Sequence, residues 1–222
     1  MSRADAFVLL DDVQFTQGAN KHNWTTRVRI AGANGAHWLT MPVRRAGAGP
    51  QRILDLRSDD KDARWLPKML RTLEDSYRKA PHSDAVMPPL TAILRQHNGS
   101  VCETNLALIE SIAAMLGITT RRLRASEIAV DGAANERLIN LTRMAGGNTY
   151  LSGDGADDYQ VEAQFRAAGI GLQKLGFRHP EYAQRPGHAF TPGLSVVDAL
   201  CHAGVDATRT MLRPTSEGGN RA

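Results

Sequence analysis

Residues Leu9 to Val43 read LLDDVQFTQGANKHNWTTRVRIAGANGAHWLTMPV. The apolar run that leads into this stretch, Ala6 to Leu10, stops at two consecutive acids, which is the pattern of a short strand buried on both faces. After a polar loop, the segments Trp24 to Ile30 and His37 to Val43 flank a turn rich in glycine and asparagine. The stretch therefore predicts a buried strand followed by a β-hairpin.

The rest of the chain predicts helices that alternate with short strands. Strands are expected at Ile53 to Leu56, Ile118 to Leu123, Thr149 to Leu151 and Gly171 to Leu175. Helices are expected from about Ser58 to Tyr77, from Ser83 to Gln96 with a late start or a break at Pro88 and Pro89, from Cys102 to Leu116, from Asn135 to Ala145, over Val161, Phe165 and Ala168, and from Ser195 to His202. This order predicts an α/β fold, a mainly parallel sheet with flanking helices plus an N-terminal β-hairpin, in a single domain over residues 1–213. A polar, disordered tail is expected from 214 to 222.

Composition limits the class of protein. The chain has 222 residues, of which 42% are hydrophobic and 23% charged, as in soluble globular domains. No segment approaches the ~20 apolar residues of a membrane span, and the N-terminal apolar run is too short for a signal peptide. Cys102 and Cys201 lie in apolar helical patterns, so reduced, buried thiols are expected, and a nucleophilic role is disfavoured. We therefore expect a cytoplasmic protein.

The net charge of +4 comes mostly from scattered arginines. Their densest cluster, Arg121, Arg122 and Arg124, is thin evidence for nucleic-acid binding, and a solvated basic face is the favoured interpretation. An anionic or nucleotide-linked small-molecule substrate fits the charge as well. The seven histidines show no paired ligand spacing, so no structural metal is expected, and neither a cofactor nor an oligomeric state is indicated, which leaves a homo-oligomer open.

Asp11 and Asp12 are the candidate catalytic residues. Ligands of α/β proteins bind at the carboxyl ends of parallel strands, where a carboxylate can orient or deprotonate an acceptor. Side chains alternate along a strand, so the two acids are expected to point to opposite faces. The alternative is a strand-end acid that caps the following turn.

A second candidate element is the segment from Ser152 to Tyr159. A strand that ends at Ser152-Gly153 and opens directly into a helix would place backbone N–H groups around an anion. We assign Ser152, Gly153, Gly155 and Tyr159 to substrate binding, on the opposite side of a ligand from Asp11 and Arg27. The alternative is a tight turn in which Asp154 caps the helix.

The remaining candidate binding residues lie in the opening stretch. Gln14, Asn23 and Arg27 offer hydrogen bonds to a polar ligand, and Arg27 suits a carboxylate or phosphate. Trp24 and Trp38 can stack on a base or sugar ring, although core packing is the commoner role of tryptophan.

An ordered set of short motifs resembles the WbqC-like family over nearly the whole chain. The set comprises LDDVQF (Leu10 to Phe15), the Trp24 to Ile30 strand with Arg27, WLTMPV (Trp38 to Val43), Trp65 with Lys68, Tyr77 with Ala80-Pro81, Asn105, Leu116-Gly117-Ile118, Glu136-Arg137-Leu138, YLSG (Tyr150 to Gly153) with Gly155 and Tyr159, Tyr182, Gln184 and LSVVDAL (Leu194 to Leu200). Two departures stand out. Thr26 and Val28 replace asparagines, and the chain lacks a Gln-Pro-aromatic-x-Pro turn before Leu10, which indicates either a start codon placed too late or a lost part of the site.

The resemblance implies a role in gene clusters for surface polysaccharide, including O-antigen in lipopolysaccharide biosynthesis, or for specialised metabolites. It implies transfer of an acyl or aminoacyl group to an amino sugar or similar amine. The alternatives are a non-catalytic paralogue that binds a small molecule or nucleotide, and, more weakly, a nucleic-acid-associated module.

Overall fold

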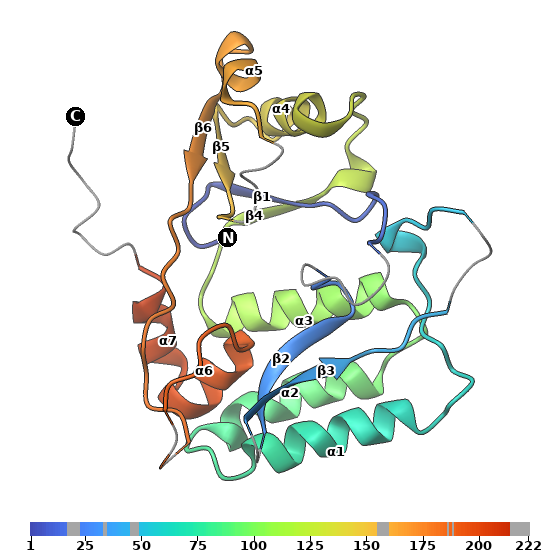
Figure 1. Ribbon diagram of the computed structural model, residues 1–222, viewed down its shortest axis with the longest axis vertical. Helices are drawn as coiled ribbons and strands as arrows, with labels where there is room; N and C mark the ends of the chain where they lie inside the picture. The colour runs from blue at the N-terminus through green and yellow to red at the C-terminus, as the bar shows by residue number, and fades with distance from the viewer. Residues whose placement is uncertain are drawn as a thin grey trace. The chain divides into compact units, whose positions relative to one another are not determined.

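Strand β1 (Ala6–Leu9) pairs in parallel with β4 (Arg121–Arg124), so the beginning of the chain joins a segment from its middle (Figure 1). This computed structural model describes residues 1–16, 23–32, 35–44, 49–154, 160–185, 187 and 189–213. The chain divides into two compact units: unit 1 is Met1–Asp12 with Thr119–His179, and unit 2 is Val13–Ile118 with Pro180–Ala222. The expected tail from 214 to 222 lies outside the described residues.

Unit 1 is built from two parallel strand pairs. After β4 come the short 3-10 turn η2 (Ala125–Glu127), α4 (Ala134–Met144), β5 (Thr149–Ser152), α5 (Glu162–Ala167) and β6 (Gly171–Lys174), and β5 pairs with β6. Parallel neighbours require a crossover, which α5 supplies between β5 and β6. Phe165 is fully buried and packs with Ile139 and Ile170, and its ring stacks on Tyr150 with centroids 5.6 Å apart.

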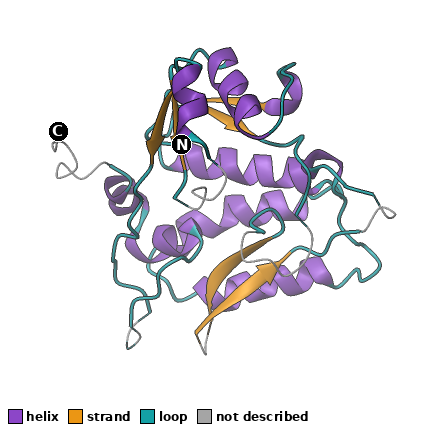
Figure 2. Cartoon of the chain, turned by 45° about the horizontal axis from the view of Figure 1, so that its top comes forward, coloured by secondary structure: helices purple, strands orange, loops and turns teal. Residues whose placement is uncertain are grey.

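Unit 2 combines an antiparallel hairpin with a helical layer. Strands β2 (Arg27–Gly32) and β3 (Gly35–Thr40) pair with Arg29 opposite Trp38. Helices α1 (Trp65–Tyr77), α2 (Ser83–Arg95) and α3 (Val101–Met115) follow, with α2 between the other two and the hairpin against α1 (Figures 1 and 2). The unit closes with α6 (Val196–Ala203) and α7 (Val205–Met211). As expected, Ser195 is the N-cap residue of α6, and its hydroxyl accepts a hydrogen bond from the Val197 amide.

Helix α2 contradicts the predicted break at Pro88 and Pro89. Both prolines lie inside a continuous helix of 13 residues. Each interior proline removes one backbone donor and costs about 3 kcal/mol. The same helix buries Val86, Met87, Leu90 and Leu94, and each such burial contributes about 1.5–3 kcal/mol, which offsets the loss.

The strand predicted at Ile53 to Leu56 is also wrong. Ile53–Asp55 forms a 3-10 turn, η1, in which the Leu56 amide donates to the Ile53 carbonyl. An ion pair between Arg52 and Asp55 at 2.8 Å spans this turn, and Leu56, the residue after the turn, is fully buried. A turn therefore buries the same apolar residue that the pattern assigned to a strand.

The α/β class, the parallel pairing and the N-terminal hairpin are confirmed. Among the described residues the strands form three separate pairs, β1 with β4, β2 with β3, and β5 with β6. The boundary of one domain over residues 1–213 stays a prediction.

Candidate functional site

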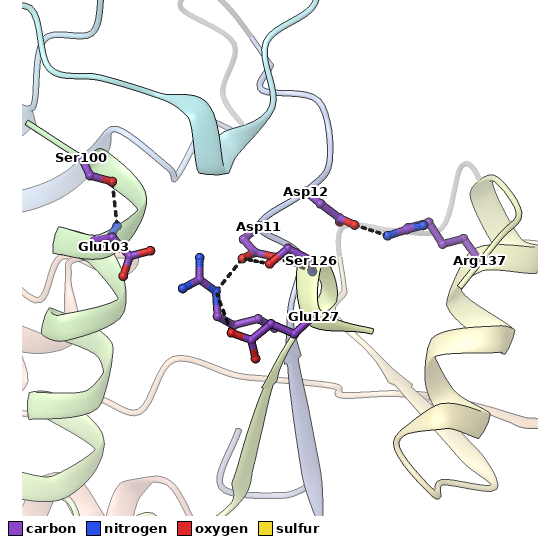
Figure 3. A network of polar contacts seen from close by, with 8 residues as sticks. Asp11, Asp12, Ser100, Glu103, Ser126, Glu127 and Arg137 are labelled. Atoms are coloured by element: carbon purple, nitrogen blue, oxygen red, sulfur yellow. Dashed lines mark hydrogen bonds and ion pairs between the residues drawn. The ribbon is translucent and has the colours of Figure 1, made fainter. Parts of the chain in front are cut away.

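Asp11 is held by three hydrogen bonds within unit 1. One carboxylate oxygen accepts from Arg124 Nε at 2.7 Å and from Ser126 Oγ at 2.7 Å, and the other accepts from the Ser126 amide at 2.9 Å (Figure 3). Burial alone would raise the pKa of Asp11, but the hydrogen bonds from Ser126 and Arg124 outweigh it and hold the pKa below its ordinary value. Asp11 therefore caps η2, the turn after the neighbouring strand β4.

Asp12 is bound to a different partner. Its carboxylate accepts a hydrogen bond from the guanidinium of Arg137 on α4, and Figure 3 shows the side chains of Asp11 and Asp12 pointing in different directions. This agrees with the expected divergence of the two acids. An arginine binds each carboxylate, and the catalytic assignment of the two acids stays a prediction.

The end of β5 contacts the segment that follows β6. Helix α5 begins at Glu162, and the Asp154 carboxylate accepts hydrogen bonds from the amides of Gly176 and Phe177, both at 2.7 Å. Residues 155–159 lie outside the described residues, so the predicted opening into a helix and the Asp154 cap stay predictions. Asp154 ties the end of β5 to the segment after β6, a contact that local sequence does not reveal.

The structure describes two of the four predicted binding residues of this turn. Ser152 is buried and its hydroxyl donates to the carbonyl of Gly153, while a side chain at Gly153 would meet no described atom within 4 Å. Gly155 and Tyr159 lie outside the described residues. The binding role of all four stays a prediction.

The structure does not bring Ser152 close to Asp11. Arg3, which precedes β1, donates to the carbonyl of Leu175 at 3.3 Å, and the Leu175 amide donates to the carbonyl of Ser152 at 2.8 Å. Asp11 follows the other end of β1, and Figure 1 shows the end of β5 beside the beginning of β1. Strand β1 therefore lies between the two predicted elements, and each of its residues advances the chain by about 3.3 Å.

Unit 2 contains a cavity of about 250 Å³ at the base of the hairpin. It includes two of the predicted binding residues, Asn23 and Arg27. Its lining is Phe15, Asn23, Thr26, Arg27, Thr40, Met41, Pro42, Val43, Arg44 and Gln51. Asn23 and Thr26 are buried and lie 3.4 Å apart from Oδ1 to Oγ1, so their polar atoms are fixed in the cavity wall.

A pair of exposed tryptophans adjoins this cavity. Trp24 is 56% exposed and Trp38 is 39% exposed, and their ring centroids are 5.6 Å apart. The guanidinium carbon of Arg27 lies 4.2 Å from the centroid of Trp38, a cation–π contact that holds Arg27 over the ring. Core packing is therefore not the role of these tryptophans, and their exposure is compatible with the predicted stacking.

Eight of the ten lining residues were not predicted, among them Thr40, Arg44 and Gln51. Arg44 begins the stretch RRAGAGP of residues 44–50, Gln51 follows it, and Thr40 lies at the end of β3. A loop of this type can cover a site, although a plain connector is the interpretation that the sequence favours. The loop composition was the available signal, because basic, glycine-rich loops often border sites. Conversely, Gln14 is exposed, forms a bridge with Arg52 and does not line the cavity.

The sequence profile of the WbqC-like protein family matches residues 1–210. The chain belongs to the WbqC-like family. It is also similar to the uncharacterized protein Rv1507c of Mycobacterium tuberculosis, with 31% identity over 205 residues, which cover 91% of this chain and 86% of that protein. No solved structure matches.

Several motifs of this WbqC-like chain hold one another in place. Arg137 of the Glu136-Arg137-Leu138 motif pairs with Asp12 of LDDVQF. Tyr182 donates to Asp198 of LSVVDAL at 2.8 Å, and Asn105 donates to the carbonyl of Thr25 at 2.7 Å. Motifs that lie far apart in the sequence therefore meet as structural contacts.

The cysteines of the WbqC-like chain are free and buried. Burial, reinforced by the nearby charge of Asp198, raises the pKa of Cys201 to about 12. A thiol with such a pKa stays protonated at neutral pH and is a poor nucleophile.

Arginines of the basic cluster serve the fold. Arg121 donates to the carbonyl of Ala145 at the end of α4, Arg122 donates to the carbonyl of Thr120, and Arg124 binds Asp11. Similarly, Arg209 donates to the carbonyl of Leu116 at the end of α3. Cations at helix C-termini complement the helix dipole, so this charge does not require a nucleic-acid partner.

The described part of the chain shows no group of His, Cys, Asp and Glu side chains suited to a metal ion. Among the same residues, no helix is both long and apolar enough to cross a membrane.

Proposed function

We propose that this WbqC-like chain binds the anionic part of a small molecule in the unit 2 cavity. The reaction served by this binding is transfer of an acyl or aminoacyl group to an amino sugar or similar amine, in surface-glycan or specialised-metabolite biosynthesis. The observation that carries the proposal is the meeting of Arg27 and Arg44 with the polar groups of Asn23, Thr26 and Gln51 around one cavity. Arginine with amide and hydroxyl donors is the usual recognition set for phosphate and carboxylate.

The size of the cavity supports an anionic end group rather than a whole cofactor. Sites for drug-sized ligands usually have about 300–1,000 Å³, and this cavity has about 250 Å³. A phosphate or carboxylate fits inside, and the remainder of a nucleotide-linked molecule extends outside. Trp24 and Trp38 offer a ring-stacking surface beside it.

In the proposed transfer, the amine nitrogen forms a bond to the carbonyl carbon of the donor. The bond from that carbon to the leaving group breaks, and the leaving group departs with the electron pair. The nitrogen must lose a proton in the same sequence of steps, so the site needs a proton acceptor.

The alternative is a binding protein without catalysis. It is supported by the cavity lining, which contains neither a carboxylate nor an imidazole in the described part of the chain. The neutralisation of Asp11 and Asp12 by arginines points the same way. Both alternatives share the anion site and differ in whether a proton acceptor lies within reach.

Replacing Arg27 with Ala tests the shared anion site. We expect binding of UDP, measured by calorimetry, to weaken about tenfold to a hundredfold, because a charged hydrogen bond contributes about 1.5–3 kcal/mol. The UDP-induced rise in melting temperature should fall accordingly. Arg71→Ala is the matched control, since Arg71 is 85% exposed on α1.

Equal affinity of wild type and Arg27→Ala for UDP would refute this anion site. A wild-type protein that is stabilised by neither UDP, UDP-glucose, acetyl-coenzyme A nor inorganic phosphate would refute the small-molecule function. Mass-spectrometric detection of N-acylated glucosamine in the presence of acetyl-coenzyme A would favour transfer over binding alone.

A further inference from the structure

A chain of polar side chains lies beside the cavity of unit 2. His97 Nδ1 is 2.6 Å from Thr104 Oγ1, and His97 Nε2 is 2.9 Å from Ser58 Oγ. Ser58 Oγ is in turn 2.7 Å from Asp60 Oδ1, which also accepts from Trp65 Nε1 at 3.4 Å. Ser58 is fully buried, whereas Asp60 is exposed, so the chain leads from the interior to the surface.

The hydrogen atoms of this chain can be assigned from its inner end. Thr104 Oγ1 lies 2.8 Å from the carbonyl of Ser100, which can only accept, so the single hydroxyl hydrogen of Thr104 points there. Thr104 must then accept from His97, which places a hydrogen on Nδ1. In neutral His97, Nε2 therefore carries a lone pair and faces Ser58.

One proton is missing from the outer half of the chain. Ser58 has one hydroxyl hydrogen and two neighbours that accept, Nε2 of His97 and the carboxylate of Asp60. One added proton completes every contact: Nε2–H then donates to Ser58, and Ser58 donates to Asp60. The hydrogen-bond pattern therefore leaves room for one added proton, on Nε2 of His97.

This chain adjoins the wall of the anion cavity. Val43 and Ser58 form an antiparallel bridge, the Arg44 amide donates to the carbonyl of Arg57 at 2.9 Å, and the Asp59 amide donates to the carbonyl of Pro42 at 2.9 Å. The hydrogen bond from Ser58 and, to a smaller extent, the charge of Arg44, a cavity residue, hold the pKa of Asp60 below its ordinary value, so Asp60 is a carboxylate. The proton acceptor that the cavity lining lacks is therefore present in the adjacent segment.

We propose that Asp60 takes the proton from the acceptor amine, and that Ser58 and His97 are positioning residues that draw this proton inward. The inference rests on the proposed transfer function and assigns its base. The N–H bond of the acceptor ammonium breaks, its electron pair stays on nitrogen, and the proton bonds to Asp60. The proton then passes to Ser58 Oγ as the Ser58 hydrogen moves to Nε2, so Asp60 returns to the carboxylate form and His97 becomes imidazolium.

The surroundings of His97 keep its ring neutral before the transfer. Burial lowers the pKa of His97, Asp60 opposes this effect, and Arg57 adds to it, so the pKa lies below its ordinary value. Thr104 and the edge of Trp65, whose ring centroid is 5.3 Å from that of His97, contribute no charge. His97 is therefore neutral at physiological pH and free to receive a proton.

The assignment of hydrogens is tested in the free protein by NMR with ¹⁵N-labelled histidine, using His97→Gln to identify the signal. We expect the Nδ1–H tautomer at pH 8, and Thr104→Val should abolish it. Asp60→Asn should move the titration midpoint of His97 to lower pH by about one pH unit, because an opposite charge is lost. The exposed neighbour Asp62, which pairs with Arg64, provides the control Asp62→Asn, with an unchanged midpoint.

The location of the amine is tested with two matched probes, glucosamine and N-acetylglucosamine. Ammonium bound at Asp60 should move the midpoint of His97 to lower pH by repulsion, whereas the neutral probe should have no effect, and Asp60→Asn should remove the difference. An Nε2–H tautomer in the free wild type, or identical responses to the two probes, would overturn the proposal. Neither measurement uses the anion site, so failure of UDP binding is distinguished from failure here.

Discussion

Asp11→Ala is expected to lower the free energy of unfolding by about 3 kcal/mol. The substitution removes the carboxylate that binds Arg124 and that accepts a hydrogen bond from the Ser126 amide. Removing one partner of a buried ion pair typically costs about 3–5 kcal/mol. The lower end of this energy range applies because Arg124 is 27% exposed, so water partly solvates its guanidinium in the variant. Urea unfolding followed by circular dichroism measures the change.

The pH dependence of this effect has a definite sign. The pKa of Asp11 is depressed below its ordinary value of 3.8, so its stabilising contribution is complete above that pH and is lost as pH falls through the lower, folded-state pKa. The difference in stability between wild type and Asp11→Ala should therefore be constant from neutral pH down to about pH 5 and shrink below about pH 4.

Asp62→Ala is the control for this measurement, since it removes an exposed ion pair with Arg64 and should leave stability unchanged within error. An Asp11→Ala variant as stable as wild type would contradict the structural role of Asp11. That outcome would favour the catalytic role that its place at a strand end suggested.

Phe165→Ala is expected to destabilise unit 1 by about 4 kcal/mol. Phe165 is fully buried among Ile139 and Ile170 and stacks on Tyr150, and truncating a buried phenylalanine typically costs about 3–5 kcal/mol. Val161→Ala is the matched control because Val161, which belongs to the same predicted helical pattern as Phe165, is 46% exposed. Similar losses for the two variants in urea unfolding would contradict this packing.

Local sequence patterns were sufficient for most elements. The paired segments around Gly32 and the stripe of α3 repeat at the period of the structures they form. The apolar run before Asp11 forms the predicted strand, but its residues are only partly buried, so the expected burial on both faces is wrong. The pattern failed where burial outweighed backbone preference, as at Pro88 in α2. It also failed at Ile53, where a 3-10 turn buries the next residue.

The candidate site was less accessible to prediction, because its contacts join distant segments. Asp11 and Arg124 are 113 positions apart, and Asp12 and Arg137 are 125 apart, so no local window links them. A strand-end acid looks the same in sequence whether it meets a ligand or an arginine. For the same reason, Asp60 and His97 gave no signal, since Ser58 joins them only in the folded chain.

The central claim is that the anion site lies at the base of the hairpin in unit 2, and shift mapping tests it most directly. Uniformly ¹⁵N-labelled protein is titrated with UDP, and the amide signals are followed. The account expects the largest shifts at Asn23, Thr26, Arg27, Thr40 and Arg44, and their loss in Arg27→Ala. Shifts confined to Ser152–Asp154 and to Asp11, with none around the cavity, would contradict it.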